Sequence, residues 1–121
     1  MAQTIYKTVV TKLGESVNEF LEQGMLITFK DNAPETLAEY CILHSENDLM
    51  ENIEVGDTLF IGHDSYRIIG VGEAVNKNLK ALGHITFDFN GSEEVDLPGT
   101  LALENKAISQ IKVGDVIKIE R

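Results

Sequence analysis

The stretch Ile85-Thr86-Phe87-Asp88-Phe89-Asn90-Gly91 alternates apolar and polar side chains and ends on an Asn-Gly pair. Alternation with a period of two places the apolar side chains on one face of a β-strand. An Asn-Gly pair is a strong hairpin signal, because both residues tolerate a positive φ. The stretch therefore predicts a half-buried strand over residues 85–89, followed by a tight hairpin turn.

Seven further short apolar runs have the length and composition of strands. They are separated by Gly, Asn and Asp, residue types that favour turns. The strands predicted from them cover residues 5–13, 25–29, 40–43, 58–61, 66–71, 100–103 and 116–119. Strands this short and this numerous predict a mainly all-β fold, a single-domain, barrel-like β-sandwich.

Two segments have helical spacing instead. Residues 16–23 carry apolar side chains three and four positions apart, with Ser16 as a possible N-cap and Gly24 as a stop. Residues 73–82 show the same spacing, and Gly83 suits the left-handed position that follows a last helical turn. We therefore expect two short helices packed over the barrel-like sheet.

A five-residue pattern occurs twice. Ile53-Glu54-Val55-Gly56-Asp57 matches Ile111-Lys112-Val113-Gly114-Asp115, and each copy precedes an apolar run. Five positions are too few to establish two related halves. The repeat predicts a shared turn geometry before two of the strands.

The composition is that of one folded domain, since 43% of the 121 residues are hydrophobic. No linker or low-complexity segment divides the chain, so we expect residues 1–121 to form a single domain. No apolar run approaches the roughly 20 residues that span a bilayer. The first residues lack the basic region and apolar block of a secretion signal. The one cysteine, Cys41, excludes an internal disulfide and is consistent with a reducing cytoplasm.

The formal net charge of −10 narrows the choice of partners. Phosphate backbones and anionic lipids both require clustered Lys and Arg, so the charge argues against binding to nucleic acid or to a lipid surface. An acidic surface keeps a protein in solution and steers basic partner surfaces toward it.

The candidate reacting groups are three histidines, His44, His63 and His84. Histidine titrates near neutrality, so it can act as a nucleophile, a base or a metal ligand. A metal site needs three or four convergent ligands, and the spacing of these residues does not provide them. Cys41 is three residues before His44, and positions three apart on a strand point to opposite faces. We therefore expect neither a metal site nor a Cys-His nucleophile pair.

A single nucleophilic histidine at a strand end suits transient phosphoryl carriage. An imidazole nitrogen attacks an activated phosphoryl group, and the phosphoramidate then passes the group on. The transition state is loose, so the protein mainly supplies positioning and hydrogen-bond donors. Such a carrier requires no cofactor.

Several short motifs, in this order and spacing, resemble a known family over essentially the whole chain. The chain resembles the glucitol/sorbitol-specific enzyme IIA component of the bacterial phosphoenolpyruvate-dependent sugar phosphotransferase system. The motifs are Ile5-Tyr6-Lys7-Thr8, Met25-Leu26-Ile27-Thr28-Phe29, Glu39-Tyr40-Cys41-Ile42-Leu43-His44, Leu82-Gly83-His84-Ile85-Thr86 and Leu97-Pro98-Gly99-Thr100.

The resemblance implies a function and site residues. It places the phosphohistidine at His44, which would accept phosphate from the phosphocarrier protein HPr and pass it to the cognate IIB domain. The membrane IIC component then moves a sugar alcohol, which is phosphorylated during uptake. His84 also matches a family histidine, and we expect it to lie near His44 and support the reaction. Where the family motif has a second histidine, this chain has Glu46.

Two rival classes stay open. The chain could be a non-catalytic β-barrel binding module in which His44 is structural. It could also be a small hydrolase or metal-dependent enzyme that uses His44, His63 and His84.

The carrier reading makes a further prediction about charge, because the family implies that HPr is basic around its reactive histidine. The acidic residues near His44 in the sequence are then expected on a rim that attracts HPr, because carboxylates inside the site would repel a phosphoryl dianion. We expect neutral polar and apolar groups next to the ring. The rim residues are Glu39, Glu46, Asp48 and Glu51.

Overall fold

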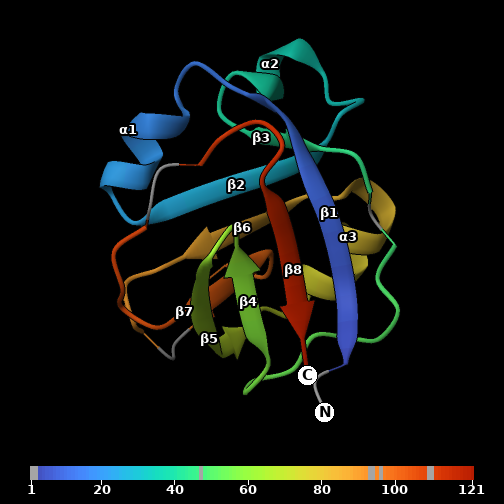
Figure 1. The fold of residues 1–121 in the computed structure, drawn as a ribbon, viewed down its shortest axis with the longest axis vertical. Coiled ribbons are helices and arrows are strands. Elements are labelled where there is room, and N and C mark those ends of the chain that lie inside the picture. Colours follow the sequence, from blue (N-terminus) through green and yellow to red (C-terminus); the bar gives the residue numbers. More distant parts are fainter. Residues whose placement is uncertain (1–2, 47, 93–94, 96, 109–110) are drawn as a thin grey trace.

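The computed structural model describes residues 3–46, 48–92, 95, 97–108 and 111–121. In this part of the chain, eight strands close into a barrel in the order β1-β3-β2-β6-β7-β5-β4-β8 (Figure 1). The strands are β1 (Thr4–Leu13), β2 (Met25–Lys30), β3 (Ile42–His44), β4 (Thr58–Ile61), β5 (Asp64–Val71), β6 (Ile85–Asp88), β7 (Thr100–Leu103) and β8 (Val116–Glu120). The predicted all-β, barrel-like fold is confirmed.

Three short helices accompany the strands: α1 (Val17–Glu22), α2 (Glu35–Ala38) and α3 (Val75–Leu82). The predicted helices correspond to α1 and α3. Gly83 adopts the expected left-handed conformation after α3, with φ of 65°. Ser16 occupies the N-cap position of α1, but its side chain makes no capping hydrogen bond. None of the helices in the described residues is long and apolar enough to cross a membrane.

Strand β3 begins two residues later than predicted. The amides of Tyr40 and Cys41 donate to the carbonyls of Leu37 and Ala38, so α2 is extended by a further turn before the chain becomes extended. Helix α2 was missed because a four-residue helix shows no periodicity in the sequence. His44 therefore lies within β3 and not beyond its end.

The predicted hairpin at Asn90-Gly91 is wrong. Gly91 has the expected positive φ of 77°, but β6 and β7 run parallel, with Thr86 opposite Thr100. The antiparallel partner of β6 is β2, where Leu26 lies opposite Phe87. The alternation predicted the strand and its buried face correctly, whereas the identity of its neighbour depends on residues far away in the chain.

The interior of the barrel is one apolar core, with Ile42, Leu59, Ile68, Leu101 and Ile119 among its fully buried members. A second, smaller cluster of Phe29, Cys41 and Leu43 lies on the outer face of β2 and β3. Because Ile42 belongs to the first cluster and Leu43 to the second, β3 alternates between the inside and the outside of the barrel.

The repeated pattern forms two matching turns, as predicted. The carboxylate of Asp57 accepts the amide of Glu54 at 2.9 Å, and Asp115 accepts the amide of Lys112 at the same distance. Gly56 and Gly114 have φ of 100° and 95°. The turns lead into β4 and β8, which pair with each other. They differ in one respect, since Arg121 also contacts the Asp57 carboxylate through Nε and Nη2, each at 3.2 Å.

Candidate functional site

His44 points into the barrel. In β3 it is on the same face as Ile42, opposite Val10 of β1 and Lys30 of β2. The residue is fully buried, with 0% of its surface exposed. A strand-end histidine was expected from the sequence, and the closed barrel converts that position into an enclosed one.

Both nitrogens of the His44 ring have a partner. Nε2 lies 2.7 Å from the carbonyl oxygen of Gly83, and Nδ1 lies 2.9 Å from the hydroxyl of Thr8. A carbonyl oxygen only accepts, so Nε2 is the nitrogen that donates in this arrangement. The lone pair on Nδ1 then accepts the proton of Thr8. The ring is held as one tautomer of the neutral imidazole.

The close approach of Gly83 requires glycine. A Cβ atom there would meet the ring of His44 at 2.8 Å from Cε1 and 2.9 Å from Nε2. The positive φ of Gly83 is also one that other residues rarely adopt. The glycine that ends α3 therefore serves the site as well, because it brings a carbonyl group against the imidazole.

The surroundings of His44 keep the ring uncharged. Burial lowers the pKa of His44, and the bond to the Gly83 carbonyl opposes this only in part. Burial also raises the pKa of the nearby Tyr6 phenol, which stays protonated. Tyr6 and Thr8 are 2% and 1% exposed. The ring is thus a neutral imidazole in contact with neutral polar groups, as predicted for the surroundings of His44.

His84 lies on the outer face of the same sheet. Its Nδ1 donates to the carbonyl of Thr28 at 3.0 Å, and its ring packs at 5.0 Å on Phe29 of the outer cluster. The next residue, Ile85, is in the barrel core. His84 is linked to His44 through the main chain, because Gly83 immediately precedes it and Thr28 also donates to the Gly83 carbonyl at 3.3 Å.

The other predicted candidates lie elsewhere. His63 is exposed in the turn between β4 and β5. Cys41 is buried in the outer cluster, and burial raises the pKa of its thiol to about 11. It is therefore on the opposite face of β3 from His44, as its spacing predicted. Within the described ranges, no three His, Cys, Asp or Glu side chains gather as a metal-binding group.

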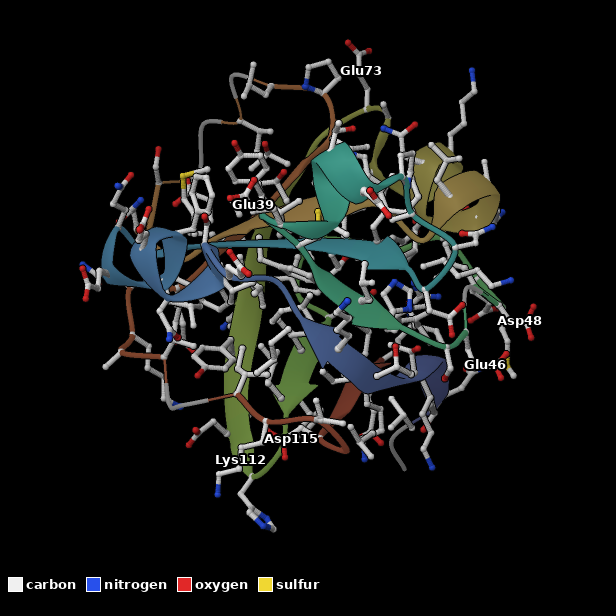
Figure 2. All side chains as sticks on the ribbon, turned by 90° about the horizontal axis from the view of Figure 1, so that it is seen from above. Glu39, Glu46, Asp48, Glu73, Lys112 and Asp115 are labelled. Atoms are coloured by element: carbon white, nitrogen blue, oxygen red, sulfur yellow. The ribbon has the colours of Figure 1, made fainter. Side chains whose placement is uncertain are left out.

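Of the four acidic residues expected on a rim, two flank the His44 site. Glu46 and Asp48 are exposed and lie side by side in Figure 2, and both raise the pKa of Tyr6 through their charge. Glu39 lies well apart from them in the same view. Glu51 is exposed but engaged by Arg121, at 3.0 Å from Nη1. The acidic rim near the imidazole therefore contains two of the four predicted residues, Glu46 and Asp48.

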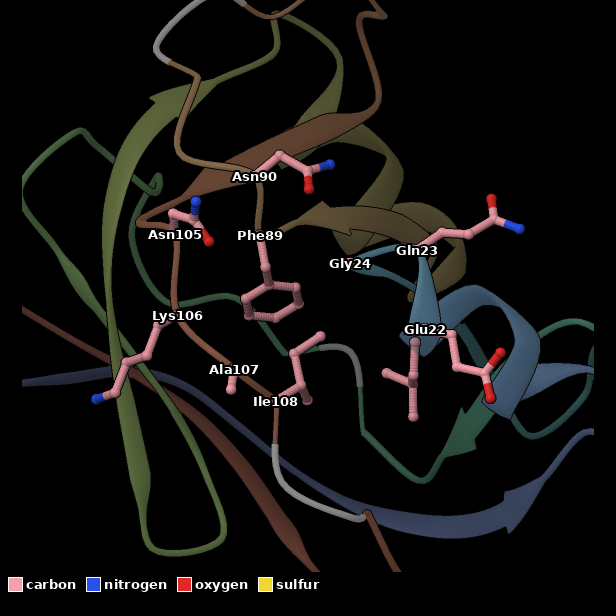
Figure 3. Close-up of a pocket in the computed structure, with 10 residues that line it drawn as sticks. Glu22, Gln23, Gly24, Phe89, Asn90, Asn105, Lys106, Ala107 and Ile108 are labelled. Atoms are coloured by element: carbon pink, nitrogen blue, oxygen red, sulfur yellow. The ribbon is translucent and has the colours of Figure 1, made fainter.

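A surface pocket of about 360 Å³ is separate from His44 (Figure 3). Its lining comes from the end of α1 and from two segments around Asn90 and Asn105. None of the residues that contact the His44 ring lines it.

Sequence reasoning missed Tyr6, Thr8 and the Gly83 carbonyl as parts of the site. A signal was present for two of them. In β1, positions 6, 8 and 10 fall on one face, and Val10 marks that face as the buried one. Two polar residues on a buried face require polar partners, which is a reason to look for a third polar group inside.

Fold and site together define a small closed β-barrel domain that encloses one neutral, hydrogen-bonded imidazole. The family model for the PTS system glucitol/sorbitol-specific IIA component matches residues 5–118, and the chain belongs to this family.

Similar proteins agree with this assignment. The chain is 36% identical over 116 residues to the PTS system glucitol/sorbitol-specific EIIA components of Escherichia coli (strain K12) and Shigella flexneri. These alignments cover 96% of this chain and 94% of each relative. The crystal structure of a PTS system IIA component from Enterococcus faecalis V583 superposes with a TM-score of 0.82 at 27% identity. The superposition covers 93% of this chain and 97% of the Enterococcus faecalis chain.

Proposed function

We propose that the protein is the phosphoryl carrier of a sugar phosphotransferase system and that His44 is its acceptor. It receives a phosphoryl group from phosphorylated HPr and passes it to the cognate IIB domain, for IIC-dependent uptake and phosphorylation of a sugar alcohol. Residues 1–121 act as a single IIA domain, which one barrel with one main core supports. The protein works in the cytoplasm, where HPr and the IIB domain are found in such systems.

The observation that carries the proposal is the state of the His44 ring. A neutral imidazole is the nucleophilic form, and burial lowers the pKa of His44 so that this form prevails at neutral pH. Among the described residues, the groups in contact with the ring are uncharged donors and acceptors, which suit a phosphoryl dianion better than carboxylates would. Carriage on imidazole needs a free nitrogen, so the proposal includes no metal or cofactor.

The first transfer exchanges one phosphorus–nitrogen bond for another, because the bond between phosphorus and the donor histidine of HPr breaks as the bond to a nitrogen of His44 forms. In the second transfer the bond between phosphorus and His44 breaks as phosphorus bonds to the acceptor group of IIB. Both ring nitrogens are hydrogen-bonded in the described conformation. The nitrogen that attacks must therefore exchange its present partner for phosphorus, so docking of HPr is expected to loosen the site.

We propose an indirect role for His84. Its bond to the Thr28 carbonyl anchors the segment that presents the Gly83 carbonyl to Nε2 of His44. His84 has two ways of supporting the reaction, contact with the phosphoryl oxygens and orientation of the imidazole, and this arrangement favours the second.

Phosphoryl uptake tests the proposal. The protein is incubated with phosphoenolpyruvate, enzyme I and HPr, and acid-labile, base-stable phosphate is measured on it. The wild type and a His63→Gln control should take up phosphate, whereas His44→Gln should fold and take up none. Uptake at the wild-type level by His44→Gln would contradict the acceptor assignment. No uptake by the wild type would favour the binding-module alternative.

A further inference from the structure

The hydroxyl of Thr8 joins two groups that are distant in sequence. It lies 2.9 Å from Nδ1 of His44 and accepts the main-chain amide of Glu46 at 2.9 Å. The hydroxyl has a single proton. Because a lone pair of the Thr8 oxygen accepts the amide proton of Glu46, the hydroxyl proton of Thr8 remains available for donation to the imidazole.

The hydroxyl of Tyr6, two residues earlier on the same face of β1, holds the other main-chain group of Glu46. It donates to the Glu46 carbonyl at 3.0 Å and lies 3.4 Å from Nδ1 of His44. Its proton is thus committed to the carbonyl, which leaves Thr8 as the donor to the ring. The Ile-Tyr-x-Thr motif of β1 is in this way an element of the His44 site.

Both bonds to residue 46 involve its main chain, and its side chain is exposed. The arrangement therefore does not depend on which side chain stands there. This accounts for Glu46 at a position where the family motif has a second histidine.

We propose that Thr8 is the positioning residue for His44 and that its hydroxyl couples the orientation of the imidazole to the chain segment that follows β3. The proposal rests on His44 being the phosphoryl acceptor. A hydroxyl that accepts one hydrogen bond becomes a stronger donor in the next, so the two bonds of Thr8 support each other. Loss of the hydroxyl frees the ring to rotate and frees the amide of Glu46 at the same time.

The experiment compares Thr8→Val, which keeps the shape of the side chain without its hydroxyl, with Thr8→Ser, which keeps the hydroxyl. Thr4→Val is the matched control, because Thr4 is in the same strand and its hydroxyl donates to Glu120. Initial rates of uptake from phosphorylated HPr are measured. We expect Thr8→Val to lower the rate about tenfold, which corresponds to one lost hydrogen bond to the reacting group. Thr8→Ser should restore most of the rate, and Thr4→Val should match the wild type.

Nuclear magnetic resonance of the imidazole nitrogens provides a readout that a purely structural role would not change. In the wild type, the Thr8 hydroxyl proton should exchange slowly and show a coupling to Nδ1 of His44. This measurement needs no variant. In Thr8→Val, the Nδ1 resonance should move, and Thr8→Ser should bring it back.

Two results would overturn the positioning role. One is uptake by Thr8→Val at the wild-type rate, and the other is a wild type without coupling between the Thr8 proton and Nδ1. Failure of the proposed function is recognised separately, because either the wild type would then take up no phosphate or His44→Gln would still take it up, whatever the spectra show.

Discussion

The two faces of the sheet around β2 and β3 each carry one histidine, and the two histidines differ in burial and in hydrogen bonding. On the inner face, His44 is fully buried and bonded at both ring nitrogens. On the outer face, His84 is partly exposed, bonded through Nδ1 to a carbonyl and packed on Phe29. The two are joined through one peptide group, between Gly83 and His84. Alternation along the strands thus encloses one histidine among hydrogen-bonding partners and leaves the other at the surface of the barrel.

The largest expected effect comes from a substitution that crowds the ring of His44. Gly83→Ala places a methyl group within 3 Å of the His44 ring, so the ring must move. A displaced reacting group can cost about a hundredfold in rate, and we expect that loss of phosphoryl uptake. Gly62→Ala is the control, because Gly62 has a similar φ of 59° but a Cβ atom there would lie 3.9 Å from its nearest neighbour, the carboxylate of Asp115.

Both glycine variants should lose about 1 kcal/mol of stability to backbone strain, measured by urea unfolding, and Gly83→Ala should lose more because its methyl group crowds the buried ring. Only Gly83→Ala should lose the uptake. Equal uptake by the two variants would mean that close contact with Gly83 is irrelevant to His44.

Removal of the outer histidine should have a smaller effect. His84→Gln loses the anchor on the Thr28 carbonyl but leaves His44 and its partners in place. We expect initial uptake to fall about fivefold, the effect of one hydrogen bond of about 1 kcal/mol. If His84→Gln abolishes uptake as completely as His44→Gln, the outer histidine takes part in the transfer directly and the contrast between the two faces is wrong.

The buried state of His44 should also appear in the pH dependence of stability. Its pKa is lowered by burial from the ordinary value of about 6.5. Above that value the ring is neutral in both the folded and unfolded chain. As the pH falls below it, the unfolded chain binds a proton that the folded chain refuses, so the free energy of unfolding decreases.

Urea unfolding from pH 7.5 to 5.5 should therefore show a steeper loss of stability for the wild type than for His44→Gln. The carboxylates titrate in both proteins, so the difference between the two slopes of unfolding free energy against pH reports the titration of His44. Superimposable slopes would show that burial of the ring has no energetic consequence.

The smallest effect concerns the rim. Glu46→Lys and Asp48→Lys should each slow encounter with phosphorylated HPr a few-fold at low salt. The effect should shrink at physiological ionic strength, where the Debye length is about 8 Å. Glu39→Lys makes the same change of charge away from the site and should change the rate less. A rate indifferent to salt and to all three substitutions would mean that the acidic excess serves to keep the protein in solution.

The strands could be predicted from the sequence because alternation is a local property. All eight predicted strands overlap the observed ones to within two residues at each end, and the strand predicted at 40–43 begins two residues later because α2 precedes it. The neighbours of each strand could not be predicted. The Asn90-Gly91 pair predicted an antiparallel hairpin, whereas the observed neighbour is the parallel strand β7.

The site was predictable only in part for the same reason. His44 stood out by residue type, and Gly83 stood out as the end of a helix. That these two meet depends on β2 lying between β3 and β6, which is a long-range property of the barrel. Tyr6 and Thr8 fall on the buried face of β1, but that they meet His44 depends on the pairing of β1 with β3.

The two matching turns have a consequence for how the barrel keeps its register. A slip of one residue would bring the inner side chains of a strand to the outside. Each turn closes on itself through an aspartate and leaves an isoleucine buried at its start and a valine exposed at its tip, with Val55 63% and Val113 62% exposed. Neighbouring strands β4 and β8 therefore each start from a fixed point. The repeat therefore fixes the phase of the sheet at two adjacent strands of the barrel.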